Sequence, residues 1–232
     1  MRIQLLLVSS ILILIAAAPA TRPFTPTSDY TPKTIQGWKV LISNDLQEND
    51  PVTSSACLAL LDHKLFEVTR VIPARALEKL RQVTIWLERD NPLTPGGAYH
   101  PSRQWLVEHG MNPEKAKCVE FGHAKNFLTW SRDQPSLVIH ELSHAYHDRV
   151  LGFDHPEIRA AYQKAKESKT YDAVLRINGR IEKAYAMNDE KEYFAELSEA
   201  YFGTNDFYPF VRAEVKKHDP EMVEVLKRVW GR

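Results

Sequence analysis

The sequence predicts an α+β domain in which a small mixed sheet packs on a helix from a mostly helical C-terminal half. Its 232 residues, 44% hydrophobic and 26% charged, match an ordinary globular protein of one full-sized domain. Short β-branched and aromatic runs occur mainly before residue 122. After residue 133 the apolar residues recur mainly at helical spacing, between helix start and stop signals.

The charge balance excludes two classes of protein. The chain has 30 Lys and Arg against 30 Asp and Glu, mixed along its length. A neutral chain of this kind gives no electrostatic case for binding nucleic acid. It is also unlike an acidic, disordered tail protein. We therefore expect no nucleic-acid partner, and the sequence carries no signal for an oligomeric state.

The N-terminus has the pattern of a secretory signal peptide. Met1-Arg2 precedes an apolar run over 3–17, and Ala18-Pro19-Ala20 then offers a small-x-small cleavage site. The alternative is an uncleaved anchor, but the run is short for a membrane span. We expect residues 1–20 to be removed, and the protein to be secreted or periplasmic without stable membrane insertion. Residues 21–36, rich in Thr and Pro, are expected to form a flexible leader before a single domain at 37–232.

Two cysteines, Cys57 and Cys118, are the only ones in the chain. In an oxidising compartment they are candidates for a disulfide. Two free thiols are an equally good interpretation of the sequence.

The first half of the chain contains the expected strands. Runs rich in β-branched and aromatic residues predict strands at 38–42, 83–87 and 117–121, and helical spacing predicts helices at 54–71 and 74–81. The sequence leaves open whether 117–121 is an edge or an inner strand. Trp86, Trp105 and Trp130 are expected in the core.

The second half contains clearer start and stop signals. Asp133-Gln134-Pro135 predicts a helix start, and Gly152 predicts its end after Leu151. Asn178-Gly179 predicts the turn of a β-hairpin over 174–185. Asn188 or Asp189 is expected to cap a helix that ends near Gly203. Further helices are expected at 208–217 and 219–229.

The first helix of this half carries the pattern HExxH, from His140 to His144. Residues four apart lie one above the other on a helix, so both imidazoles reach a single ion. Glu141 lies close enough to accept a proton from a water activated by that ion. Imidazole suits zinc, and we expect one Zn²⁺ per chain. The alternative is a surface helix with spaced histidines.

A catalytic zinc needs a third protein ligand. His147 shares a face with the two histidines, but three ligands from one straight helix rarely surround one ion. We therefore place His147 behind the ligands or in the cleft wall. The helix at 188–203 offers Glu192, Glu196 and Glu199 on one face. Glu192 is either the third ligand or a capping-box residue paired with Asp189. Glu196 is expected to accept an imidazole N–H.

Taken together, three segments resemble the catalytic domain of anthrax lethal factor and its relatives: His140 to Ala145, Tyr185, and Glu192 to Glu196. The resemblance covers roughly 133–210. It implies a zincin-like fold and a zinc site of the gluzincin type, completed by Glu192. It also implies that Tyr185, seven residues before that ligand, points into the site and assists catalysis.

These observations predict an exported zinc metallopeptidase that hydrolyses peptide or protein substrates, with Glu141 as general base. Two alternatives remain at the level of sequence. One is a zinc-dependent hydrolase of a non-protein amide. The other is a catalytically inactive, zinc-stabilised exported module for binding or adhesion.

Overall fold

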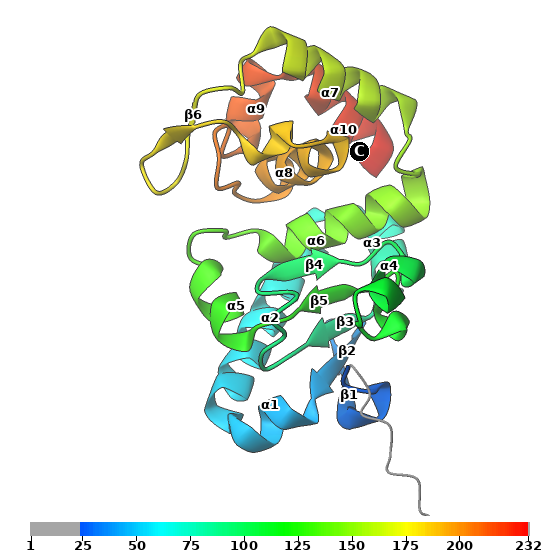
Figure 1. Ribbon diagram of the computed structural model, residues 1–232. Helices are drawn as coiled ribbons and strands as arrows, with labels where there is room; N and C mark the ends of the chain where they lie inside the picture. Colours follow the sequence, from blue (N-terminus) through cyan, green and yellow to red (C-terminus); the bar gives the residue numbers. More distant parts are fainter. Residues whose placement is uncertain (1–23, 232) are drawn as a thin grey trace, which may run out of the picture.

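The computed structural model describes residues 24–231 and shows a mixed α+β architecture (Figure 1). A five-stranded sheet is built from β1 (Tyr30–Ile35), β2 (Trp38–Ser43), β3 (Ile85–Leu87), β4 (Gly97–Tyr99) and β5 (Val119–Phe121). A separate hairpin pairs β6 (Val174–Leu175) with β7 (Ile181–Glu182). The expected signal peptide lies outside the described residues. Within 24–231, none of the helices has the length and apolar character needed to span a membrane.

Helices make up most of the remaining chain. The α-helices are α1 (Asn44–Asn49), α2 (Pro51–Val71), α3 (Ala74–Leu80), α4 (Arg103–Glu108), α5 (Ala124–Trp130), α6 (Leu137–Tyr146), α7 (Pro156–Ser168), α8 (Glu190–Phe202), α9 (Arg212–His218) and α10 (Pro220–Trp230). Short 3-10 turns are η1 (Thr27–Asp29), η2 (Pro113–Lys115) and η4 (Tyr185–Met187), and η3 (His147–Leu151) is a π-helical turn after α6.

The strand order is β1-β2-β3-β5-β4. The central pairs β2–β3 and β3–β5 are parallel, whereas β1 and β4 are antiparallel to their neighbours at the two edges. The strand expected at 117–121 is thus an inner strand. Its neighbour β4, which was not predicted, forms the edge beside α6 (Figure 1).

The expectation of a flexible leader over 21–36 is wrong for its second half. Tyr30–Ile35 forms β1, paired along its whole length with β2. Gln36 and Gly37 make the two-residue turn between them, both with positive φ, which suits the twist of a hairpin. Pro32 hides the strand in the sequence, but an edge strand tolerates proline.

One face of the sheet forms the main core. Alternate side chains of β3 and β5, including Ile85, Leu87 and Phe121, join a hydrophobic cluster that extends from Ile35 to Trp230. The opposite face carries Trp86 and a group of buried charged residues. Trp105 and Trp130, expected in the core, are instead 44% and 40% exposed.

Of the two interpretations of Cys57 and Cys118, the structure has the free thiols and no disulfide between them. Cys57 is buried in the main core, where its thiol donates to the Ala124 carbonyl at 3.3 Å. Cys118 packs with the cluster on the other face of the sheet. The sheet therefore separates the two thiols.

The C-terminal half packs on α6 from the side opposite the sheet (Figure 1). The indole of Trp230 stacks on Tyr146 of α6 and Phe194 of α8, which joins α10 to both helices.

The hairpin around Gly179 and the helices α8, α9 and α10 confirm the predicted elements, with shifted ends. Helix α6 begins at Leu137, later than the predicted start, because residues 131–136 form turns after α5. The helices α1, α4, α5 and α7 were not predicted.

Candidate metal centre and its cavity

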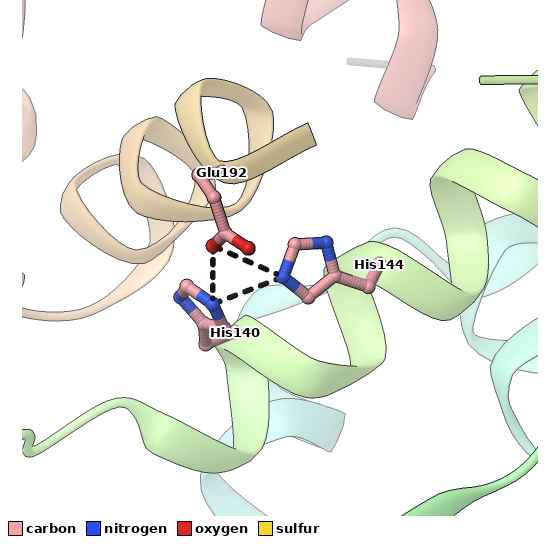
Figure 2. A group of neighbouring side chains, drawn as sticks. All are labelled: His140, His144 and Glu192. Carbon is pink, nitrogen blue, oxygen red and sulfur yellow. Dashed lines mark hydrogen bonds and ion pairs between the residues drawn. The ribbon is translucent and has the colours of Figure 1, made fainter. Parts of the chain in front are cut away.

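Two imidazoles from α6 and one carboxylate from α8 point toward one another (Figure 2). His140 Nε2 lies 3.0 Å from His144 Nε2. Glu192 Oε2 lies 3.2 Å from the first nitrogen and 3.3 Å from the second. The HExxH spacing thus brings the two rings together as predicted, and α8 supplies the third group.

The triangle of donor atoms fits a zinc ion. In tetrahedral zinc sites with ligand distances of 2.0–2.2 Å, the ligand atoms lie about 3.3–3.6 Å apart. The three separations here, 3.0–3.3 Å, are close to that spacing. Two nitrogens and one oxygen are also a donor set that zinc accepts. His140, His144 and Glu192 could therefore hold one such ion.

The first turn of α8 positions Glu192. The Asp189 carboxylate caps the helix and accepts from the backbone N–H groups of Lys191 and Glu192, at 2.8 and 3.0 Å. The Glu192 side chain turns toward the two histidines, which favours the ligand over the capping-box alternative. Burial raises the pKa of Glu192, but the two imidazoles outweigh burial and hold the pKa well below its ordinary value.

Glu199 takes the position behind His140 that we expected for Glu196. Glu199 Oε1 lies 2.6 Å from His140 Nδ1, whereas Glu196 Oε1 lies 3.8 Å from it. Such a contact fixes the ring orientation and leaves Nε2 facing Glu192. The signal for Glu199 was present in the sequence, because Glu199 shares the stripe with Glu192 two turns away. Residue type alone could not rank it above Glu196.

Buried acids gather behind the histidines. Glu196, Glu199 and Asp206 are each at most 2% exposed, and Arg176 pairs with Asp206 at 3.2 Å. Among the described residues, one oxygen of each acid has no hydrogen-bond partner. Burial raises the pKa of all three acids. The cluster is therefore rich in acidic groups and poor in positive charge that would let them ionise.

Glu141 lies on the side of α6 that faces the sheet edge. Burial raises its pKa, and a hydrogen bond from the Tyr99 backbone N–H opposes the rise. A Cβ added at Gly97 of β4 would lie only 2.7 Å from Glu141 Oε1, so glycine permits the close approach of strand and carboxylate. A carboxylate with a raised pKa beside an ion site suits a general base.

Tyr185 lies near His140. It begins η4, immediately before α8, and its ring centroid is 6.5 Å from that of His140. Tyr185 is 46% exposed, so part of the residue is open to a ligand. Burial of the rest of the side chain raises the pKa of Tyr185, which keeps the hydroxyl protonated as a hydrogen-bond donor.

His147 does not contribute to the site, contrary to expectation. Its ring is fully buried between Phe153 and Phe194, with centroid distances of 5.1 and 4.8 Å. Neither ring nitrogen has a hydrogen-bond partner among the described residues. Burial lowers its pKa to about 4, so it behaves as a neutral, apolar core residue. The π-helical turn begins at His147, after the regular part of α6 has ended.

A cavity of about 480 Å³ opens beside these groups. Its walls come from the edge strand, α6, η4 and the segment after α8, and include Gly97, Ala98, His140, Glu141, Tyr185 and Phe207. The cavity therefore gives a ligand access to the proposed base, one proposed metal ligand and the Tyr185 hydroxyl at once.

Comparisons of the chain with protein-family models, with curated proteins and with solved structures found no match.

Proposed function

We propose that the protein is an exported zinc metallopeptidase with a zincin-like fold, similar in its site to the catalytic domain of anthrax lethal factor. The observation that carries the proposal is the triangle of His140, His144 and Glu192 beside Glu141 in an open cavity. A catalytic rather than structural zinc is favoured because three protein ligands leave a fourth position for water. We also propose that export follows from the signal peptide pattern at 1–20.

Six residues at the metal centre and its cavity have roles in this proposal. His140, His144 and Glu192 would hold zinc, which supplies Lewis acidity that activates water and polarises a carbonyl. Glu141 accepts the proton of the attacking water and passes it to the departing amine. The Tyr185 hydroxyl donates a hydrogen bond to the carbonyl oxygen as negative charge develops. Glu199 orients the His140 ring through Nδ1.

The edge strand supports a peptide as substrate. The bonds from Gly122 N to Gly96 O and from His100 N to Cys118 O join every second residue of this segment to β5. The peptide groups of Gly97 and Tyr99 therefore point away from β5. The Tyr99 N–H is used by Glu141, so an extended peptide would pair with Gly97 and lie along the cavity beside Glu141.

The test is cleavage of a diverse peptide library by zinc-loaded protein, residues 21–232, with products identified by mass spectrometry. Glu141→Gln protein is the control, because it keeps the proposed ligands and loses the base. The proposal predicts cleavage by the wild type alone. Equal product patterns from both proteins would contradict it.

The two alternatives correspond to other outcomes. Hydrolysis of a non-protein amide by the wild type, with every peptide intact, would favour the non-peptide hydrolase. Tight zinc binding with no rate difference between wild type and Glu141→Gln on any substrate would favour the inactive binding or adhesion module.

A further inference from the structure

A second cavity, of about 530 Å³, lies on the other side of the edge strand β4. Helix α4 forms one wall and contributes Trp105, while Leu93, Ala98 and His100 line it from the loop before β4, from β4 and from the residue after β4. None of the proposed metal ligands or catalytic groups lines this cavity. It is therefore separate from the cavity at the metal centre.

The two cavities nevertheless adjoin. Leu93, Thr94 and Ala98 line both of them. A ligand that follows β4 from the metal centre can therefore place one side chain in each cavity.

Side chains along β4 point alternately to the two faces of the sheet, and this explains how one peptide would use both cavities. Gly97 faces Glu141, and the Tyr99 side chain enters the main core and donates to Asp148 at 2.6 Å. Ala98 lies between them and therefore points to the opposite face. Successive side chains of a peptide paired with β4 alternate in the same way, so every second one points toward the Trp105 cavity.

From this geometry we infer that the Trp105 cavity is a specificity subsite for a large apolar side chain of an extended peptide substrate. This inference rests on the proposed peptidase function. It assigns Trp105, Leu93 and Ala98 to recognition of the substrate residue whose side chain points away from α6.

The polar side chains of the cavity already have partners, which leaves an apolar side chain as the best occupant. Gln104 donates to Glu108 at 2.8 Å, and the Ser102 hydroxyl accepts from the Trp105 backbone N–H at 3.2 Å. His100 Nε2 already bonds Glu120 Oε2 at 2.6 Å, and Thr94 donates to the same oxygen at 3.2 Å. A polar substrate group would have to break these buried contacts, whereas an apolar one leaves them intact.

The orientation of the Trp105 ring is fixed, and part of the residue remains exposed to a substrate side chain. The ring stacks on His109 with centroids 3.9 Å apart, which orients the indole on the surface of α4. The side chain is still 44% exposed, so a large part of its apolar area is free to be covered. Covering it against an aromatic or aliphatic side chain is favourable.

The experiment compares wild type with Trp105→Ala and Val107→Ala. Val107 is the matched control, because it lies on the same helix, is 58% exposed and does not line the cavity. Peptide-library profiles from the three active proteins give the side-chain preference at each position. In a Glu141→Gln background, fluorescence anisotropy measures binding of a labelled peptide with Phe at the preferred position and of its Ala counterpart.

We expect the wild type to prefer large apolar side chains at one position. Trp105→Ala should reduce that preference about tenfold or more in kcat/KM. In the Glu141→Gln background it should weaken the Phe peptide's Kd to the same extent, with little change for the Ala peptide. Val107→Ala should stay within about twofold of wild type in both assays.

The outcomes separate the subsite from the peptidase function. Cleavage with a preference that Trp105→Ala leaves unchanged would overturn the subsite and leave the function standing. Absence of cleavage, with binding of the Phe peptide that depends on Trp105, would support the subsite and contradict the peptidase. No difference in binding between the Phe and Ala peptides would overturn the subsite.

Discussion

Two groups of buried charged side chains lie in this protein, and they differ in how completely they are paired. One lies on the sheet face away from α6, where both oxygens of Glu120 are used. Oε1 accepts from Lys115 and Asn91 at 2.6 and 2.8 Å, and Oε2 contacts His100 at 2.6 Å. Glu88 accepts from the same lysine. This first cluster is complete without any external ligand.

The second group lies between α6 and α8. Here Glu192, Glu196, Glu199 and Asp206 each have an oxygen without a hydrogen-bond partner among the described residues. Buried charge is costly unless it is paired, so this cluster requires positive charge from protons or from a metal ion. Burial of charged side chains alone therefore does not indicate a functional site. Buried acids that lack hydrogen-bond partners, next to an open cavity, do indicate one.

The largest expected effect is on turnover and concerns Glu141 at the edge of the incomplete cluster. Glu141→Gln should lower kcat about 10²- to 10⁴-fold, because an amide cannot accept the proton. The zinc content of the purified variant, measured by inductively coupled plasma mass spectrometry, should stay at one ion per chain. Loss of zinc in this variant would contradict a role for Glu141 as base rather than ligand.

Glu120 in the complete cluster should affect stability and not zinc binding. Burial raises its pKa, but the His100 hydrogen bond and the charge of Lys115 lower it to about 2. Relative to an ordinary value of 4.5, this difference corresponds to about 3 kcal/mol of folding free energy. Glu120→Gln should lose roughly that amount at pH 7 in urea unfolding.

The pH dependence follows from the sign of this shift. The folded pKa is depressed, so the stabilisation is fully present above about 4.5 and is lost as the pH falls through about 2. The difference in unfolding free energy between wild type and Glu120→Gln should therefore become smaller as the pH falls from about 4.5 to about 2. A difference that stayed constant from pH 7 to pH 2 would show that the charge of Glu120 is not its cause.

Substitutions of Glu199 and Glu196 should affect zinc binding differently, although both residues belong to the incomplete cluster. Glu199→Gln should weaken zinc binding about 10- to 100-fold, because it loses the carboxylate that orients His140. Glu196→Gln is the matched control, since its nearest oxygen is 3.8 Å from the same nitrogen. Competition with a chelator measures both affinities. Equal losses in the two variants would contradict the assignment of Glu199.

Tyr185 should give the smallest effect. Tyr185→Phe removes one hydrogen-bond donor to the developing charge and should lower kcat about tenfold or more, with zinc affinity unchanged. Steady-state kinetics on a cleaved peptide checks this result. An unchanged kcat would remove Tyr185 from the mechanism.

The sequence predicted those parts of the fold and site that depend on local pattern. The HExxH spacing, the capping by Asp189 and the Asn178-Gly179 turn are all local, and each appears in the structure. Strand β1 was missed because Pro32 and a polar surface resemble a leader until pairing with β2 is known. Strand β4 has only three residues, and the pair Gly96-Gly97 at its start is typical of a loop.

Long-range contacts explain the other errors. His147 shares a helical face with His140 but lies two turns further along, where Phe153 and Phe194 cover its ring. The choice between Glu196 and Glu199 depends on how α8 crosses α6, which no local pattern encodes. The complete cluster around Glu120 joins residues from three separate segments, so no local sequence pattern predicts it.

The central claim is that one zinc ion completes the cluster between α6 and α8. Calorimetric titration of metal-free protein, residues 21–232, with Zn²⁺ tests it most directly. We predict one ion per chain, retained by Glu141→Gln and strongly weakened by His140→Ala and by Glu192→Ala. Saturation with zinc should also raise the unfolding temperature, because the ion binds the folded state. Absence of binding, or binding that survives both ligand substitutions, would contradict the claim.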